Sequence, residues 1–348
     1  MKDTLLGKTP AELKEAALKV GLPAFAGKQL AGWLYGRRVL SIDEMTNISK
    51  VGRERLKDEY DLGVVAPSGC QVSRDGTKKY LFPLGGEDAV EAVMIPDEER
   101  RTLCVSSQAG CRMGCKFCMT GRQGFHGDLS VAEILSQFIA IDESMDLTNA
   151  VFMGMGEPLD NYDNVLRAIE VLTSDWGFGW SPKRITLSTI GVLPNLRRFL
   201  DETRCHLAVS LHNPFPEERA VIMPVQKAWP EEAVIDLIRE YDFTGQRRVS
   251  FEYTMFAGLN DTKRHADALI RLLKGLECRV NLIRFHKIPD APFETSPQIV
   301  MENFRDRLSN HGITCTIRAS RGEDIMAACG MLAGEHRKNI RTTKTVEP

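Results

Sequence analysis

The segment Cys111-Arg-Met-Gly-Cys115-Lys-Phe-Cys118 places three cysteines within eight residues and largely decides how this chain is interpreted. Its C-x3-C-x2-C spacing follows an apolar run, Leu103 to Ser106, that is typical of a strand. Thiolates in so short a loop can all face one metal centre. Structural zinc sites and ferredoxin clusters normally use four protein ligands. Because three cysteines leave one position open for a small molecule, we interpret the segment as the binding site of a 4Fe–4S cluster.

There are three other interpretations of these cysteines besides the cluster: a zinc site, a disulfide and buried unligated thiols. A zinc site would need a distant fourth ligand, such as His126 or Cys104. A disulfide is disfavoured because nothing in the chain indicates secretion. Buried, unligated cysteines are disfavoured because polar residues alternate with them. The cluster is the preferred interpretation, and zinc remains the alternative.

The composition is that of an ordinary soluble globular protein. The chain has 348 residues, of which 43% are hydrophobic and 26% charged, enough for one large domain or for a large and a small one. The N-terminus lacks the apolar run of a signal peptide, and no later run is long enough to span a membrane. Nine cysteines without a secretory signal indicate a reducing compartment. We therefore predict a cytoplasmic monomer without a membrane partner.

The charge balance does not by itself indicate a nucleic-acid partner. The net charge is −2, whereas nucleic-acid-binding domains usually show a basic bias. Local basic runs occur at Arg37-Arg38, Lys78-Lys79 and Arg247-Arg248, and in residues 336–344. Such runs are more often solvated faces than binding sites.

Residues 1–62 are predicted to form a small helical accessory domain. Thr9-Pro-Ala-Glu12 begins a first helix, which ends at Gly21. A second helix carries Gln29, Leu30, Trp33 and Leu34, and Ser41-Ile-Asp-Glu44 has the form of a capping box that opens a third. Apolar residues repeat at helical spacing through the first two helices. Their simplest use is to pack the helices against one another.

Residues 63–100 are predicted to form a β-hairpin extension. Two strand-like runs, 78–84 and 89–96, flank Gly85-Gly86. Glu91 alternates with apolar neighbours in the second run, a pattern that predicts a position on the solvent face.

Residues 101–335 alternate between strand and helix patterns, which indicates a parallel sheet covered by helices. The predicted strands are 102–106, 150–155, 184–189, 206–211, 248–255, 279–285 and 314–318. The predicted helices are 131–141, 164–173, 194–201, 231–241, 263–276 and 298–311. The fold class is therefore α/β, and a full or partial (β/α) barrel fits better than an open sheet. Residues 336–348 form a basic C-terminal tail.

Polar motifs fall at the predicted strand ends, where barrel enzymes place their functional residues. In Gly154-Met-Gly156-Glu157-Pro, the glycines let a ligand approach the backbone, and Glu157 can accept hydrogen bonds from an amine. Ser188 lies at the end of the next strand, and Ser210-Leu211-His212 at the end of the one after. Their hydroxyls either cap helices or bind a polar ligand.

The cysteines outside the cluster segment are interpreted from their surroundings as structural. Cys329, between Ala328 and Gly330, fits a buried position in a helix, and Cys104 fits the core of a strand. The others, which lie beside strand patterns, are Cys70, Cys205, Cys278 and Cys315.

Four motifs together resemble the RlmN/Cfr family over essentially the whole chain. They are the cluster segment, the Gly154–Pro158 motif, the Ser210–His212 turn and the Cys329 segment, in the order and spacing of that family. The family consists of radical S-adenosylmethionine (SAM) methyltransferases that modify an adenine in RNA. The stretch from Ala319 to Leu332 is most similar to the RlmN branch, which methylates adenine carbon 2 in 23S rRNA and in certain tRNAs. A Cfr-type carbon-8 methyltransferase is the alternative.

The resemblance implies a partial (β/α) barrel of the radical SAM type and an N-terminal domain that contacts RNA. Cys111, Cys115 and Cys118 would hold the 4Fe–4S cluster. The residues that would contact SAM are Gly156, Glu157, Ser188, Ser210, Leu211 and His212. An electron donor, such as a flavodoxin-type reductant, would also be required.

The resemblance further implies a route that consumes two SAM molecules per turnover. One would methylate Cys329, and the other would yield a 5′-deoxyadenosyl radical that activates this methyl group for addition to the adenine. Glu91 would accept the proton from carbon 2. Cys104 would then attack the sulfur of Cys329, which releases the product and leaves a disulfide between the two cysteines.

One position departs from the family pattern. Many relatives read Asn-Leu-Ile-Pro-Phe-Asn-Pro where this chain reads Asn281-Leu-Ile-Arg-Phe-His286-Lys287. His286 thus replaces an asparagine that touches SAM, although an imidazole can still make one hydrogen bond. Two further hypotheses are a radical SAM activase, which would need no cysteine pair, and a zinc-stabilised RNA-binding module, which would be colourless.

Overall fold

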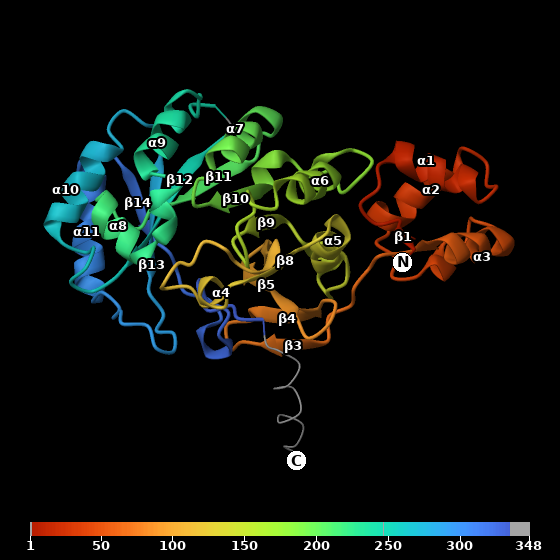
Figure 1. Ribbon diagram of the computed structural model, residues 1–348, viewed down its shortest axis with the longest axis horizontal. Coiled ribbons are helices and arrows are strands. Elements are labelled where there is room, and N and C mark those ends of the chain that lie inside the picture. Colours follow the sequence, from red (N-terminus) through yellow and green to blue (C-terminus); the bar gives the residue numbers. More distant parts are fainter. Residues whose placement is uncertain (1, 246, 335–348) are drawn as a thin grey trace, which may run out of the picture.

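The computed structural model describes residues 2–245 and 247–334, which form a large lobe around a central sheet and a smaller helical lobe beside it (Figure 1). Within these residues the main sheet has ten strands, in the order β14-β13-β12-β11-β10-β9-β6-β5-β4-β3. The strands from β6 to β14 run parallel, whereas β3 to β6 pair antiparallel. One sheet therefore joins a parallel half to an antiparallel extension.

The parallel half confirms the predicted α/β fold. Its strands are β6 (Arg100–Cys104), β9 (Asn149–Phe152), β10 (Ile185–Thr189), β11 (His206–Ser210), β12 (Val249–Met255), β13 (Arg279–Arg284) and β14 (Thr314–Ile317). The helices between them are α5 (Val131–Ile139), α6 (Tyr162–Thr173), α7 (Leu193–Glu202), α8 (Pro216–Ile222), α9 (Glu231–Arg239), α10 (Lys263–Leu272) and α11 (Gln298–Asn310). Because β14 and β3 are the two ends of one strand order, the barrel is partial rather than closed.

Burial explains why these segments become covered parallel strands. The central residues of β11, Leu207 to Val209, are all buried, as is usual for a strand that helices or core side chains cover on both faces. Helix α5 begins at a capping box made by Ser130 and Glu133 and buries Ile134 and Phe138 completely. The helices lie on the outside of the sheet (Figure 1).

The antiparallel extension is larger than the predicted hairpin. Strands β4 (Lys78–Pro83) and β5 (Ala89–Asp97) form that hairpin, and β3 (Gly69–Val72), which was not predicted, adds a third strand at the edge. The prediction that Glu91 lies on the solvent face is wrong, because its exposed fraction is only 3%. The chain near residues 333–334 covers that face of β5.

The smaller lobe contains α1 (Pro10–Lys19), α2 (Ala26–Ala31) and α3 (Lys50–Glu59), tied at its base by the parallel pair β1 (Asp3–Thr4) and β2 (Tyr60–Asp61). The capping box at Thr9 is confirmed. The one predicted at Ser41 is wrong. Its hydroxyl accepts from the amide of Asp43 and starts only a short 3-10 turn, whereas Ser49 caps α3.

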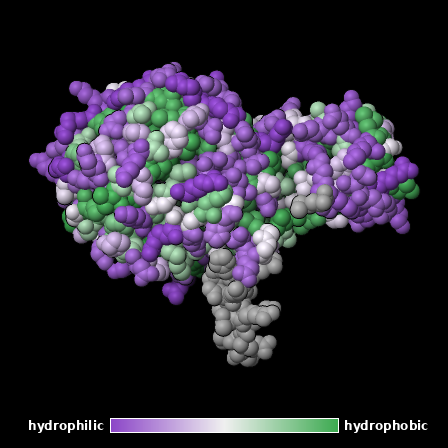
Figure 2. Space-filling model, in the orientation of Figure 1, coloured by the Kyte–Doolittle hydropathy of each residue, from purple (hydrophilic) through white to green (hydrophobic). Residues whose placement is uncertain are grey.

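The surface in view is mostly hydrophilic, and apolar side chains form patches on the large lobe and at the far end of the smaller lobe (Figure 2). The large exposed apolar residues of this lobe are Leu18, Phe25, Leu40 and Val51. No helix among the described residues is long and apolar enough to cross a membrane. The predicted basic tail, residues 336–348, lies outside the described residues.

Candidate active site

A cavity of about 160 Å³ opens where the parallel strands end. Its wall is formed by the cysteine segment after β6 and by the ends of β9, β10, β11 and β12. Predicted site residues in this wall are Cys111, Cys115, Cys118, Gly156, Glu157, Ser188, Ser210, His212 and Cys329. The structure therefore brings together most of the side chains that the sequence singled out.

A short antiparallel pair fastens the two ends of the cysteine loop. Strands β7 (Gln108–Gly110) and β8 (Phe125–Asp128) flank the loop, and the amide of Cys111 donates to the carbonyl of Gly124 at 2.7 Å. Gly110 has a φ of +69°, and a Cβ at this position would lie 1.9 Å from the Gly124 oxygen. A glycine is therefore required for this closure. We refer to the β7–β8 pair as the loop clasp.

The three cysteines of the loop share one cavity wall and lie close enough to affect one another. Burial is the main cause of the raised pKa of each thiol, and Cys111 and Cys118 further raise the pKa of Cys115. Among the described residues, no group of three His, Cys, Asp or Glu side chains has the arrangement that holds a single metal ion. All three thiols instead line the cavity. This donor set of three sulfurs around an open space fits a 4Fe–4S cluster with one free iron.

Glu157 is a buried carboxylate beside the cysteine loop. Its two oxygens accept from the amides of Leu159 at 3.0 Å and Ile190 at 2.9 Å, which link the ends of β9 and β10. Burial raises its pKa to about 7. Gly156, with a φ of +97°, lies so close to Gln108 that a Cβ would come within 2.5 Å of that side chain. The carboxylate thus has a fixed position and unused acceptor capacity for a cationic ligand.

His212 supplies a hydrogen-bond donor to the cavity. Its Nδ1 accepts from the backbone amide of Thr254 at 2.9 Å, so the neutral ring carries its proton on Nε2. Burial is the main cause that lowers its pKa to about 3, which keeps the ring neutral. The ring packs edge-on against Phe117 of the cysteine loop, with 4.9 Å between centroids.

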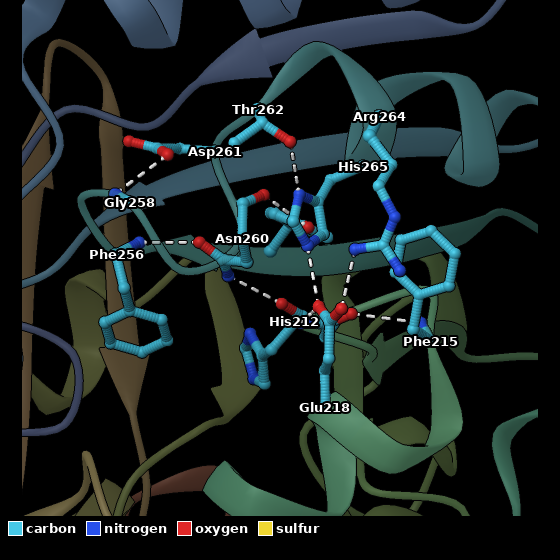
Figure 3. A network of polar contacts seen from close by, with 12 residues as sticks. His212, Phe215, Glu218, Phe256, Gly258, Asn260, Asp261, Thr262, Arg264 and His265 are labelled. Carbon is cyan, nitrogen blue, oxygen red and sulfur yellow. Dashed lines mark hydrogen bonds and ion pairs between the residues drawn. The ribbon is translucent and has the colours of Figure 1, made fainter.

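A polar network behind His212 holds it in a left-handed conformation, with a φ of +58° (Figure 3). The amide nitrogen of Asn260 donates to the carbonyls of His212 and Thr254, both at 2.7 Å. Glu218 accepts from Arg264 at 2.6 Å and is bonded to His265 at 2.7 Å. The loops after β11 and β12 are therefore linked through side chains.

A second, smaller cavity of about 90 Å³ adjoins the first and contains the other two predicted catalytic cysteines. Cys104, at the end of β6, lines only this cavity, whereas Cys118, Arg318 and Cys329 line both. Cys329 is exposed and lies in a turn, so the prediction of a buried helical cysteine is wrong. Burial, followed by the nearby Cys329, raises the pKa of Cys104 to about 12. Both are free thiols in this structure.

Three predicted site residues are absent from the walls of both cavities in the described part of the chain. Leu211 is fully buried in the core. His286 instead faces Ser320, with 3.0 Å between Nε2 and Oγ. Glu91 lies behind residues 333–334, whose amides both donate to its carboxylate, and pairs with Lys79 at 2.9 Å.

Two charged residues in the first cavity were missed by the sequence analysis. Glu252 lies on β12 with an exposed fraction of 3% and accepts from Asn281 at 2.8 Å. Arg318 follows β14, and the thiol of Cys329 is the main cause that raises the pKa of its guanidinium. A signal was available for Glu252, because a charged residue within an apolar parallel strand needs a partner.

The comparisons with known proteins agree with this geometry. Residues 105–272 match the Radical SAM superfamily, and residues 4–62 match the ribosomal RNA large subunit methyltransferase N-terminal domain. A probable dual-specificity RNA methyltransferase RlmN of Porphyromonas gingivalis is 61% identical over 95% of this chain and 94% of its own length. The dual-specificity RNA methyltransferase RlmN of Syntrophus aciditrophicus is 40% identical over 93% and 94%, respectively.

A solved structure extends this similarity to three dimensions. The crystal structure of a radical SAM methyltransferase from Sphaerobacter thermophilus is 37% identical to this chain, with a TM-score of 0.91. The match covers 96% of this chain and 100% of that one. With a cysteine loop, a cavity at the strand ends and relatives matched over nearly their full length, this chain belongs to the RlmN family of the radical SAM superfamily.

Proposed function

We propose that this chain is a radical SAM methyltransferase that methylates carbon 2 of a specific adenine in 23S rRNA and in tRNAs. The relatives' names supply the RNA class, and the family supplies the chemistry. The single observation that carries the proposal is the position of Cys329. It lies where the two cavities meet, between the cluster loop and Cys104.

When bound, a 4Fe–4S cluster at Cys111, Cys115 and Cys118 would, together with SAM, supply a carbon radical that abstracts hydrogen. The side chains around it suit the binding of SAM. Glu157 offers a carboxylate to the amino group, and His212 offers a ring N–H. Ser188 and Ser210 add hydroxyls to the same wall.

The second cavity suits a methyl group carried on the protein. Cys329 would accept the methyl from one SAM molecule. This methyl would lose one hydrogen atom to the SAM-derived radical, and its carbon would then bond to carbon 2 of the adenine. The adduct would give up the carbon-2 proton to Glu91 and return one electron to the cluster.

Arg318 lines the same two cavities as Cys329 and places a guanidinium beside the methyl-transfer site. Cys104 would attack the sulfur of Cys329, and the electrons of the broken sulfur–carbon bond would pass to the methylated base. A reductant such as a flavodoxin-type protein would reset the disulfide and supply the electron that SAM cleavage needs.

Glu91 can act as the proton acceptor only after a rearrangement. Its carboxylate is held by the amides of Ala333 and Gly334, and the structure keeps it outside both cavities. Residues 332–334 would therefore have to move when RNA binds. Displacing these two backbone donors would leave Glu91 with Lys79 as its partner and would make it available to the adenine.

Each region of the chain has a part in the proposed reaction. Residues 1–62 would contact RNA, residues 63–100 would link that domain to the barrel, and residues 101–335 would form the catalytic core with the basic tail at 336–348. We further propose a cytoplasmic monomer that uses two SAM molecules per turnover. His286 would take no direct part in SAM binding.

The test is nucleoside analysis of RNA treated with the anaerobically reconstituted protein, SAM and a reductant. We expect 2-methyladenosine from 23S rRNA and from tRNA with the wild-type protein, and none with Cys329→Ala. Cys104→Ala should accumulate protein covalently bound to RNA. Detection of 8-methyladenosine would assign a Cfr-type specificity. Normal turnover of Cys104→Ala without a crosslink would contradict the two-cysteine route.

A further inference from the structure

The barrel end opposite the two cavities carries cationic side chains that the proposed chemistry does not use. They precede or begin successive strands of the parallel half, and all are exposed. The four residues, which we call the barrel-base patch, are Lys183, Arg204, Arg248 and Arg279. Arg248 belongs to one of the basic runs visible in the sequence.

The strand order brings these side chains together around His206. Strands β10 to β13 are consecutive in the sheet, with His206 beside Thr186 and Arg279 beside Ser250. The amide of Arg248 donates to Nδ1 of His206 at 3.1 Å. Burial lowers the pKa of His206, and the next causes are the charges of Arg248, Lys183, Arg247 and Arg279. The cations therefore converge on one area.

The patch differs from other exposed arginines of the barrel in lacking carboxylate partners. Arg197, Arg239 and Arg305 each pair with a carboxylate, at 2.8, 3.0 and 2.7 Å, respectively. Within the described residues, no ion pair involves the four patch side chains. The two nearby acids are engaged by other groups. Asp201 accepts from the Tyr241 hydroxyl at 2.8 Å, and Asp242 accepts from the Thr244 amide at 2.8 Å.

An open hollow of about 520 Å³ lies within the patch, and Asp201 and Asp242 line it together with cationic residues. Lys183 and Arg204 line it, as does the buried Arg247. Arg247 is structural, because its guanidinium donates to the carbonyls of Cys205 and Leu200 at 3.0 and 2.8 Å. The exposed cations are thus held around a broad, polar depression, which suits an extended anion better than a small one.

We propose that the barrel-base patch binds the sugar–phosphate backbone of RNA at a place separate from the cavities. The inference rests on the proposed function, which supplies the RNA. Lysine and arginine contacts to phosphates release counterions and position the nucleic acid without reading its sequence. The contact would add RNA affinity to a chain whose net charge is only −2.

The patch also defines the kind of RNA that would use it. Strand β12 has seven residues and spans roughly 20 Å at about 3.3 Å per residue, with the patch at its start and the cavity towards its end. An RNA that fills the cavity with its adenine and also reaches the patch must be large and folded. A short stem-loop would contact the cavity end alone.

The test compares two triple variants that remove the same charge. The patch variant carries Lys183→Gln, Arg248→Gln and Arg279→Gln, and the control carries Arg239→Gln, Arg305→Gln and Arg307→Gln, which also pair with carboxylates. Binding of a full-length tRNA and of its short target stem-loop is measured over a range of salt concentrations. For the patch variant with tRNA, we expect affinity to fall about tenfold or more and the slope of log Kd against log salt to fall by about 2 to 3. The stem-loop and the control should change less than about twofold, because neither uses the patch.

Other outcomes separate this inference from the proposed function. If the wild-type protein forms no methyladenosine, the proposed function is wrong. The binding measurements would still test whether the patch contributes to RNA affinity. If it methylates RNA but both variants bind tRNA equally well, the patch inference is wrong. An equal loss of stem-loop binding would also overturn it, because the site would not be separate. Binding to phosphatidylserine vesicles that the patch variant loses, with tRNA binding unchanged, would replace RNA by a membrane surface. Should the triple variant unfold, Lys183→Glu alone provides the same comparison.

Discussion

Two glutamates with the same exposed fraction of 3% lie in the two halves of the sheet and have different surroundings. Glu157, in the parallel half, faces the first cavity and is held by two backbone amides and the hydroxyl of Thr189. Glu91, in the antiparallel extension, pairs with Lys79 and lies behind residues 333–334. Burial alone therefore does not indicate the role of a carboxylate. A fixed carboxylate beside a cavity suits cofactor binding, whereas a covered one with a cationic partner suits a step that follows a movement.

The largest effect should come from removing one cysteine from the loop beside Glu157 and one from the turn that precedes residues 333–334, which cover Glu91. Cys118→Ala would remove a cluster ligand, so both SAM cleavage and RNA methylation should fall to background. Cys329→Ala should abolish methylation but leave SAM cleavage, because the cofactor half stays intact. Cleavage is measured as 5′-deoxyadenosine and methylation as methyladenosine. Loss of both activities in Cys329→Ala would mean that the two halves are not separable.

Substitution of each glutamate should likewise distinguish SAM cleavage from RNA methylation. Glu91→Gln should lower methylation about 10²- to 10⁴-fold, the usual contribution of a general base, while SAM cleavage changes little. Glu157→Gln should weaken SAM binding and thereby lower both activities at low SAM concentration. Titration of SAM binding to each variant provides the measurement. Equal SAM affinities for Glu157→Gln and the wild type would remove Glu157 from the cofactor site.

Neighbouring lysines on β4 offer a matched comparison of stability. Lys79→Met would leave the buried Glu91 without its cation, and we expect the free energy of unfolding to fall by about 3 kcal/mol. Lys78 pairs with Glu143 at a more exposed position, at 2.5 Å, so Lys78→Met should cost less than about 1 kcal/mol. Urea unfolding of both variants measures the difference. Similar values would show that the 333–334 amides alone hold Glu91.

The smallest effect concerns the pH dependence of the cluster-free protein. Burial raises the pKa of Glu157 to about 7 in the folded chain, above its ordinary value near 4.5. The folded state therefore holds the proton more tightly, and the free energy of unfolding should decrease as pH rises from 4.5 to 7, by roughly 1 to 3 kcal/mol. Glu157→Gln should flatten this interval. A wild-type curve that rises there would contradict the assignment.

The parallel half was predictable because each strand and helix has its own pattern and each motif follows a strand. The extension was less predictable for physical reasons. All four residues of β3 are exposed, so no apolar period marks it. Glu91 matched a solvent-facing pattern because its cover comes from residues more than two hundred positions later in the chain. The pairing of Lys79 with Glu91 depends on strand register, which local sequence does not determine.

In the candidate site, too, contacts between residues distant in sequence could not be predicted. The cysteine loop and the Gly154–Pro158 motif were found because their residues are adjacent in sequence. Arg318 was missed because its closeness to Cys329 arises from a turn that brings the chain back over the sheet. The resemblance to a family assigned His286 and Leu211 to SAM, yet their side chains lie outside the cavity wall. The directions in which these two side chains point depend on the local backbone conformation, which a sequence motif does not specify.

The loop clasp has a consequence for how the protein matures. Strands β7 and β8 close the cysteine loop through backbone hydrogen bonds that need no iron, so the entropy of closing it is already lost on folding. Iron and sulfide would thus enter a cysteine loop that is already folded, and their binding would not be needed to fold it. A chain that loses its iron to oxygen should keep its fold and accept a replacement. Repair in place would then be sufficient, and the damaged enzyme need not be degraded and synthesised again.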